Sequence, residues 1–165
     1  METMEARMVK LYARNNNHVA LHAIPGHFAT SHSHINFYID MTSLKTRANE
    51  AQEVAKSLAG DYVNSTVVDT IVCMDGTEVV GAYLAQEFEK RGFRNTNLHD
   101  TIYVVTPEYN ANNQLIFRDN TIPAIKGKNV ILLLATTTTG LTVRRSLECV
   151  QYYGGTVHGI SSIFS

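Results

Sequence analysis

A strongly apolar run, residues 130–134, is followed by four threonines, a glycine and a helical pattern that reaches Tyr152. Five consecutive aliphatic residues bounded by polar ones are typical of a strand buried on both faces. We predict a strand at 130–134, a loop at 136–140 and a helix at 140–152. A buried strand that leads directly into a helix is typical of a parallel α/β sheet, which restricts the folds open to this chain.

The same alternation of strands and helices extends over most of the chain. Further strands are predicted at 19–24, 36–40, 70–74, 101–105, 114–118 and 157–164, and further helices at 2–14, 45–59 and 78–91. Turns are predicted at 25–26, 75–77 and 119–120, and a loop at 107–113. Right-handed crossovers then indicate an α/β, doubly wound, mainly parallel sheet with helices on both faces. Ligands of such folds bind at the carboxyl edge, where the loops 73–77, 106–113 and 136–140 leave their strands.

Composition excludes several classes of function. The 165 residues suit a single domain, and a net charge of −1 without long basic runs argues against nucleic-acid binding. No apolar run approaches the roughly 20 residues of a membrane helix, so no membrane partner is expected. Cys73 and Cys149 form no CxxC pair, which favours a reduced, cytoplasmic protein.

The threonine loop has two interpretations. As a phosphate site, it would aim hydroxyls and backbone N–H groups at one point, beside the positive end of the following helix. As a structural turn, one threonine would cap that helix. The histidines His27, His32 and His34 are interpreted as a polar loop rather than a metal site, and no protein-bound metal is expected.

Four stretches, taken in order, resemble type I phosphoribosyltransferases, and within them the orotate phosphoribosyltransferases. They are residues 31–40, 69–88, 126–130 and 130–143. The resemblance implies a single domain over residues 1–165, with a small N-terminal hood segment (1–40) and an α/β core (41–165). It also implies a phosphoribosyl ligand such as phosphoribosyl pyrophosphate (PRPP) or a nucleotide, Mg²⁺ bound with PRPP, and a homodimer.

The resemblance assigns roles to several residues. The 5′-phosphate would be held by Thr137, Thr138, Thr139, Gly140 and Thr142. The pyrophosphate loop would be formed by Cys73, Met74, Asp75 and Gly76, and the base pocket would include Phe37 and Tyr38. Arg118 and Arg144 are candidate anion contacts, since arginine binds phosphate in a bidentate manner, although both could equally be solvated surface residues.

The chain departs from the family at the positions that support catalysis. The acidic pair of the family falls on Leu134 and Ala135, its lysine-rich mobile loop on the cation-free segment 106–114, and an N-terminal lysine on Thr30. We therefore expect binding of a ribose 5-phosphate compound with weak or absent transferase turnover, and no catalytic residue is assigned. The alternative is an active enzyme that joins ribose 5-phosphate from PRPP to a nucleobase such as orotate.

Overall fold

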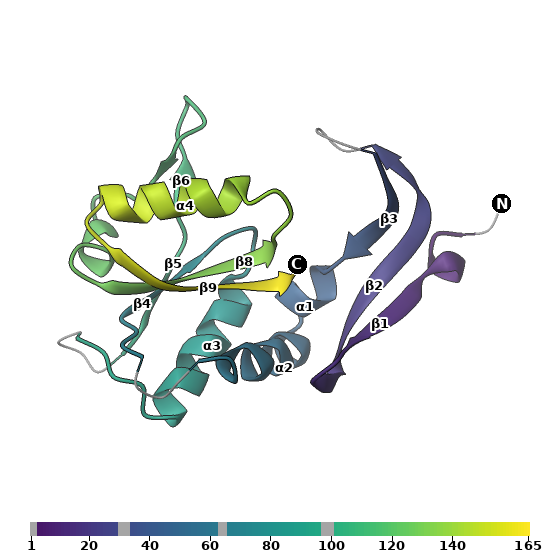
Figure 1. Ribbon diagram of the computed structural model, residues 1–165, viewed down its shortest axis with the longest axis horizontal. Helices are drawn as coiled ribbons and strands as arrows, with labels where there is room; N and C mark the ends of the chain where they lie inside the picture. Colours follow the sequence, from purple (N-terminus) through teal and green to yellow (C-terminus); the bar gives the residue numbers. More distant parts are fainter. Residues whose placement is uncertain (1–2, 30–33, 63–65, 97–100) are drawn as a thin grey trace.

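The core is a four-stranded parallel sheet in the order β5-β4-β8-β9 (Figure 1). The computed structural model describes residues 3–29, 34–62, 66–96 and 101–165. The strands are β4 (Thr70–Cys73), β5 (Tyr103–Val105), β8 (Asn129–Thr136) and β9 (Thr156–Phe164). All three pairings are parallel, so the loops that follow β4, β5 and β8 lie at one edge, as predicted.

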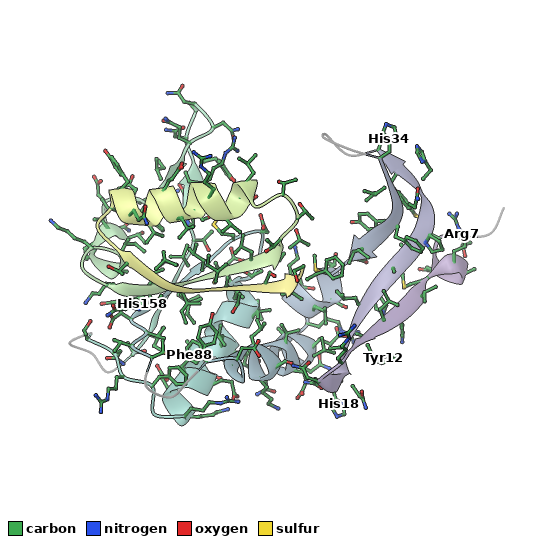
Figure 2. The ribbon with its side chains drawn as sticks, in the orientation of Figure 1. Arg7, Tyr12, His18, His34, Phe88 and His158 are labelled. Carbon is green, nitrogen blue, oxygen red and sulfur yellow. The ribbon has the colours of Figure 1, made fainter. Side chains whose placement is uncertain are left out.

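Helices cover both faces of this sheet. The helices α2 (Ala48–Ala59) and α3 (Glu78–Lys90) lie on one face, and α4 (Leu141–Tyr152) lies on the other (Figure 1). Alternate residues of β8 pack against the helices on opposite faces of the sheet, because successive side chains of a strand point to opposite faces. Ile131 and Leu133 pack in the cluster that includes Phe88 of α3, whose position Figure 2 labels, whereas Leu132 packs in the α4 cluster. The predicted doubly wound α/β fold is therefore confirmed.

The predicted helix at 45–59 is two helices in the structure. A short α1 (Thr42–Thr46) precedes α2, and between them Arg47 is extended, with φ −89° and ψ 120°. Leu44 of α1 is buried in the same cluster as the apolar face of α2. The break lets α1 turn toward the hood while both helices keep their apolar residues in the core, and no local sequence signal marks it.

The N-terminal segment is an antiparallel sheet in the order β1-β2-β3, which we call the hood sheet. It consists of β1 (Val9–Ala13), β2 (Asn16–Ala29) and β3 (His34–Asp40). The predicted helix at 2–14 is wrong: a single 3-10 turn, η1 (Glu5–Arg7), is followed by β1. Apolar and polar residues alternate from position 9 to 14, and pairing with β2 stabilises the strand, whereas so short a helix is marginal by itself.

Two smaller predictions also change. The predicted turn at 25–26 lies inside β2, where the register with β3 shifts between Pro25 and Phe28, as at a β-bulge. The predicted loop at 107–113 contains β6 (Glu108–Tyr109), which pairs with β7 (Leu115–Ile116), a shorter strand than the predicted 114–118. A 3-10 turn, η2 (Ile122–Ala124), then leads to β8. Thr30 and His32 lie outside the described residues.

Candidate functional site

The threonine loop connects the end of β8 to α4. Its last residue, Gly140, has φ 77° and ψ 1°, a left-handed conformation that glycine adopts at little cost. A Cβ at this position would meet no atom within 4 Å, so the backbone angle, and not space, requires the glycine. This conformation turns the chain from the sheet edge into the helix and leaves the loop open beside the first turn of α4.

Most backbone N–H groups of this loop are without a protein partner. Thr137 N donates to Phe164 O at 2.9 Å, and the first helical bond is Arg144 N to Gly140 O, also at 2.9 Å. Within the described part of the chain, the N–H groups of residues 138–143 donate to no protein atom. Unpaired N–H groups at a helix N-terminus favour an anion, because their partial positive charges point the same way.

The loop also encloses a small hollow of about 50 Å³, lined by residues 136–143. One water needs roughly 10–15 Å³ by the same kind of measure, so a small oxyanion has room here. The structural-turn interpretation expects a threonine to cap α4, but no side chain makes that hydrogen bond. Thr138 and Thr139 are exposed, which leaves their hydroxyls available to a ligand. The predicted phosphate residues Thr137–Gly140 and Thr142 all line this hollow.

The predicted pyrophosphate loop, residues 73–76, leaves β4 at the same edge. Asp75 and Gly76 both have positive φ, 58° and 76°, and both are exposed, whereas Cys73 and Met74 are buried. Burial, with a smaller effect from Glu78, raises the pKa of the Cys73 thiol to about 12. The thiol is therefore protonated near neutral pH and is unsuited to act as a nucleophile.

A lysine that the sequence did not point to lies against this loop. Lys45 of α1 donates from Nζ to the backbone oxygen of Asp75 at 2.8 Å. Its ammonium group places a positive charge beside a loop whose own side chain, Asp75, is acidic. The two residues are 30 positions apart, and only the packing of α1 against α2 and α3 brings them together.

Near the end of β8, the two positions that correspond to the acidic pair of the resembled family carry no carboxylate. Leu134 and Ala135 are 0% and 3% exposed, so both side chains belong to the core. Among the described residues, no group of three or more His, Cys, Asp and Glu side chains is arranged to hold a metal ion. The part of the chain that the structure describes therefore offers no such group of donors for Mg²⁺.

The two candidate arginines are paired with glutamates. Arg118 of the hairpin segment forms a two-point ion pair with Glu108, at 2.7 and 2.9 Å, and Arg144 binds Glu148 one turn along α4 at 2.9 Å. Neither arginine lines the threonine hollow. Both arginines therefore form exposed ion pairs on the surface, as expected if they are solvated residues and not anion contacts.

The predicted aromatic pair is divided between the two faces of the hood sheet. Phe37 lines a cavity beside the end of β9, whereas Tyr38 lies 5.7 Å from Phe28, measured between ring centroids, and does not line that cavity. Farther along, His34 Nδ1 lies 2.8 Å from His27 Nε2 at the upper end of the hood (Figure 2). Val9 and Leu11, which line the same cavity as Phe37, alternate along β1, and this alternation is a signal that the helix prediction at 2–14 missed.

The same fold occurs in solved phosphoribosyltransferases. The orotate phosphoribosyltransferase of Mycobacterium tuberculosis H37Rv in complex with PRPP superposes with a TM-score of 0.51 at 16% identity, over 76% of this chain and 66% of that one. Leishmania donovani UMP synthase gives 0.58 at 18% identity, over 85% and 28%. Adenine phosphoribosyltransferase from Thermoanaerobacter pseudethanolicus gives 0.56 at 14% identity, over 96% and 83%.

The chain therefore has the type I phosphoribosyltransferase fold, with a parallel four-stranded sheet flanked by helices. No protein-family model and no curated protein matches it. No described helix is long and apolar enough to cross a membrane. Cys73 and Cys149 are both buried and free.

Proposed function

We propose that this protein binds the 5′-phosphate of a ribose 5-phosphate compound, such as PRPP or a nucleotide, in the threonine loop. The observation that carries the proposal is the row of N–H groups at residues 138–143, which have no partner among the described residues and belong to the loop that lines the hollow. Orotate phosphoribosyltransferase of M. tuberculosis, which shares the fold, is known in complexes with inorganic phosphate and with PRPP. Fold alone does not decide function, so the proposal depends on the loop.

Transferase turnover should be weak or absent. Departure of pyrophosphate from PRPP needs positive charge at the leaving group, and each lost electrostatic contact of this type costs about 10²–10³ in rate. Leu134 and Ala135 replace the acidic pair, and the segment 106–114 has no cation. Because the described residues hold no group of three or more His, Cys, Asp and Glu side chains arranged for a metal ion, we assign no step to Mg²⁺, although the resemblance implies that it would accompany PRPP.

One observation favours the alternative, an active transferase that uses PRPP and a nucleobase. Lys45 brings an ammonium group to the loop at residues 73–76, where pyrophosphate would lie in such an enzyme. A lysine there would stabilise a departing pyrophosphate. Formation of orotidine 5′-monophosphate from PRPP, orotate and Mg²⁺ by the pure protein, clearly above a blank, would support this alternative over binding alone.

We also propose that the protein forms the homodimer that the resemblance implies. Analytical ultracentrifugation of the pure protein would measure its oligomeric state.

Removing both exposed threonine hydroxyls should weaken binding of ribose 5-phosphate by tenfold or more. Hydrogen bonds to a charged group are each worth about 1.5–3 kcal/mol, and 1.4 kcal/mol is a factor of ten. The measurement is calorimetric titration of ribose 5-phosphate into wild type and the Thr138→Ala, Thr139→Ala double variant. Thr156→Ala is the matched control, because Thr156 is an exposed threonine at the opposite end of β9. Equal affinity of the double variant and wild type would refute the phosphate site.

A further inference from the structure

A cavity of about 560 Å³ lies between the hood sheet and the end of β9. Its size falls within the roughly 300–1,000 Å³ of pockets that hold small molecules. Three strands of the hood supply most of its wall, because Val9, Ala23 and Ile39 face one another across the sheet. The lining is completed by further residues of β1 and β3 and one of β9: Leu11, Ile35, Asn36, Phe37 and Phe164.

Phe164 connects this cavity to the threonine loop. Phe164 lines the cavity, and its backbone oxygen accepts the hydrogen bond from Thr137 N at 2.9 Å. Phe164 is also the register partner of Thr136, the first residue of the loop. An anion site and an apolar cavity that meet at one strand end suit a single ligand with a phosphate at one end and an apolar group at the other.

The chemistry of the lining selects that second group. Of the described residues that line the cavity, none is charged, and all but Asn36 are aliphatic or aromatic. Asn36 lies between Ile35 and Phe37 on β3, so its side chain points to the other face of the strand. A carboxylate placed here would lose its water without gaining a cation, which is unfavourable. An uncharged planar ring would cover the apolar walls and stack on an aromatic side chain.

We infer that the ligand of this protein is a phosphate ester that carries an uncharged ring, held between the hood sheet and Phe164, and not the carboxylate-bearing orotate ring. This inference rests on the proposed function, because the threonine loop must hold the phosphate. Continuity with that loop identifies a small phosphate ester as the occupant. A second copy of the chain lying on the exposed apolar residues of the hood is the competing occupant, and the experiment distinguishes the two.

The test compares three probes with the same phosphate end. Ribose 5-phosphate has no ring, uridine 5′-monophosphate has a neutral ring, and orotidine 5′-monophosphate has that ring with a carboxylate added. We expect calorimetric titration to show uridine 5′-monophosphate binding at least tenfold more tightly than orotidine 5′-monophosphate, and more tightly than ribose 5-phosphate. Orotidine 5′-monophosphate binding as tightly as uridine 5′-monophosphate or more tightly would overturn the inference.

Two neighbouring aromatic residues provide a matched pair of variants. Phe37 and Tyr38 are similarly exposed, 54% and 46%, but only Phe37 lines the cavity. Phe37→Ala should weaken binding of uridine 5′-monophosphate at least fivefold and leave ribose 5-phosphate unchanged, and Tyr38→Ala should change neither. Equal effects of the two variants would contradict the assignment of the ring to this face of the hood.

A charge introduced into the cavity should reverse the preference. Leu11 lies on the outermost strand of the hood sheet and is 46% exposed, so lysine fits there with little strain. Leu11→Lys should raise the affinity for orotidine 5′-monophosphate at least tenfold relative to uridine 5′-monophosphate. Tyr12→Lys, on the same strand but outside the cavity lining, is the control and should leave the ratio unchanged. An unchanged ratio in Leu11→Lys would count against the inference.

The outcomes separate this inference from the function on which it rests. If ribose 5-phosphate itself fails to bind wild type, the proposed phosphate site is wrong. If ribose 5-phosphate binds but the ring adds no affinity, the phosphate site stands and the ring inference fails. If Phe37→Ala changes the sedimentation coefficient from that of a dimer to that of a monomer and leaves nucleotide affinity unchanged, the face is an interface between copies, which also overturns the inference.

Discussion

Replacing Asp69 by alanine should lower the free energy of unfolding by about 3 kcal/mol or more. Asp69 is 0% exposed and lies just before β4. Its carboxylate accepts hydrogen bonds from Asn129 N and Asn129 Nδ2, both at 2.8 Å, and from Thr96 N. It therefore connects the beginnings of β4 and β8 with the segment that follows α3.

The alanine variant would leave these partly buried N–H groups without their acceptor, and each group that water cannot reach costs about 1–3 kcal/mol. Urea denaturation at pH 7 measures the effect. Asp119→Ala is the control, because Asp119 is exposed in a turn and surface changes of this kind stay within about 0.5 kcal/mol. An Asp69→Ala protein as stable as the control variant would show that this hydrogen-bonded group contributes little to the sheet.

The same carboxylate should make stability depend on pH in the acid range. Burial raises the pKa of Asp69, but hydrogen bonds from Asn129 and Thr96 lower it by more, so the folded pKa lies below the usual value. The carboxylate then stabilises the fold above the unfolded pKa of about 3.9, and this contribution is lost as pH falls through the folded pKa. Denaturation between pH 2 and 6 should show a smaller loss of stability in Asp69→Asn than in wild type; curves of equal slope would contradict the assignment.

Replacing Gly81 by alanine should destabilise the protein by about 1–3 kcal/mol, although alanine is the better helix former. Gly81 lies on α3, where a Cβ would come within 2.3 Å of Cys73 Sγ and 3.2 Å of Val104 Cγ1. Cys73 is 0% exposed at the end of β4, so its sulfur atom cannot move aside into solvent. The helix and strand can approach this closely only because residue 81 has no side chain.

A double-mutant cycle tests this explanation directly. Cys73→Ala removes the sulfur atom that the new methyl group would meet, so the Cys73→Ala, Gly81→Ala protein should be more stable than the sum of the single changes predicts. A favourable coupling free energy of about 1 kcal/mol is expected for residues in contact. Additive effects in thermal or urea denaturation would show that the cost of Gly81→Ala arises elsewhere.

The core sheet and its threonine loop could be predicted because their signals are local. The apolar run within β8 is long enough to indicate a strand buried on both faces, and Gly140 marks the point at which the chain must adopt a positive φ. The hood could not be predicted in the same way. The first residues of the chain fit a helical pattern and an alternating one, and only pairing with β2 selects the strand β1.

Sequence alone thus determined the doubly wound order of strands and helices, the position of the threonine loop at the carboxyl edge, and the apolar character of Leu134 and Ala135 just before that loop. Tertiary structure alone decided that Lys45 reaches Asp75, that Phe164 joins the threonine loop to the apolar cavity, and that Phe37 and not Tyr38 lines this cavity. The reason is physical: helix and strand periods and backbone angles act over a few neighbouring residues. Contacts across 27 to 30 positions instead depend on how whole elements pack, which no short window of sequence encodes.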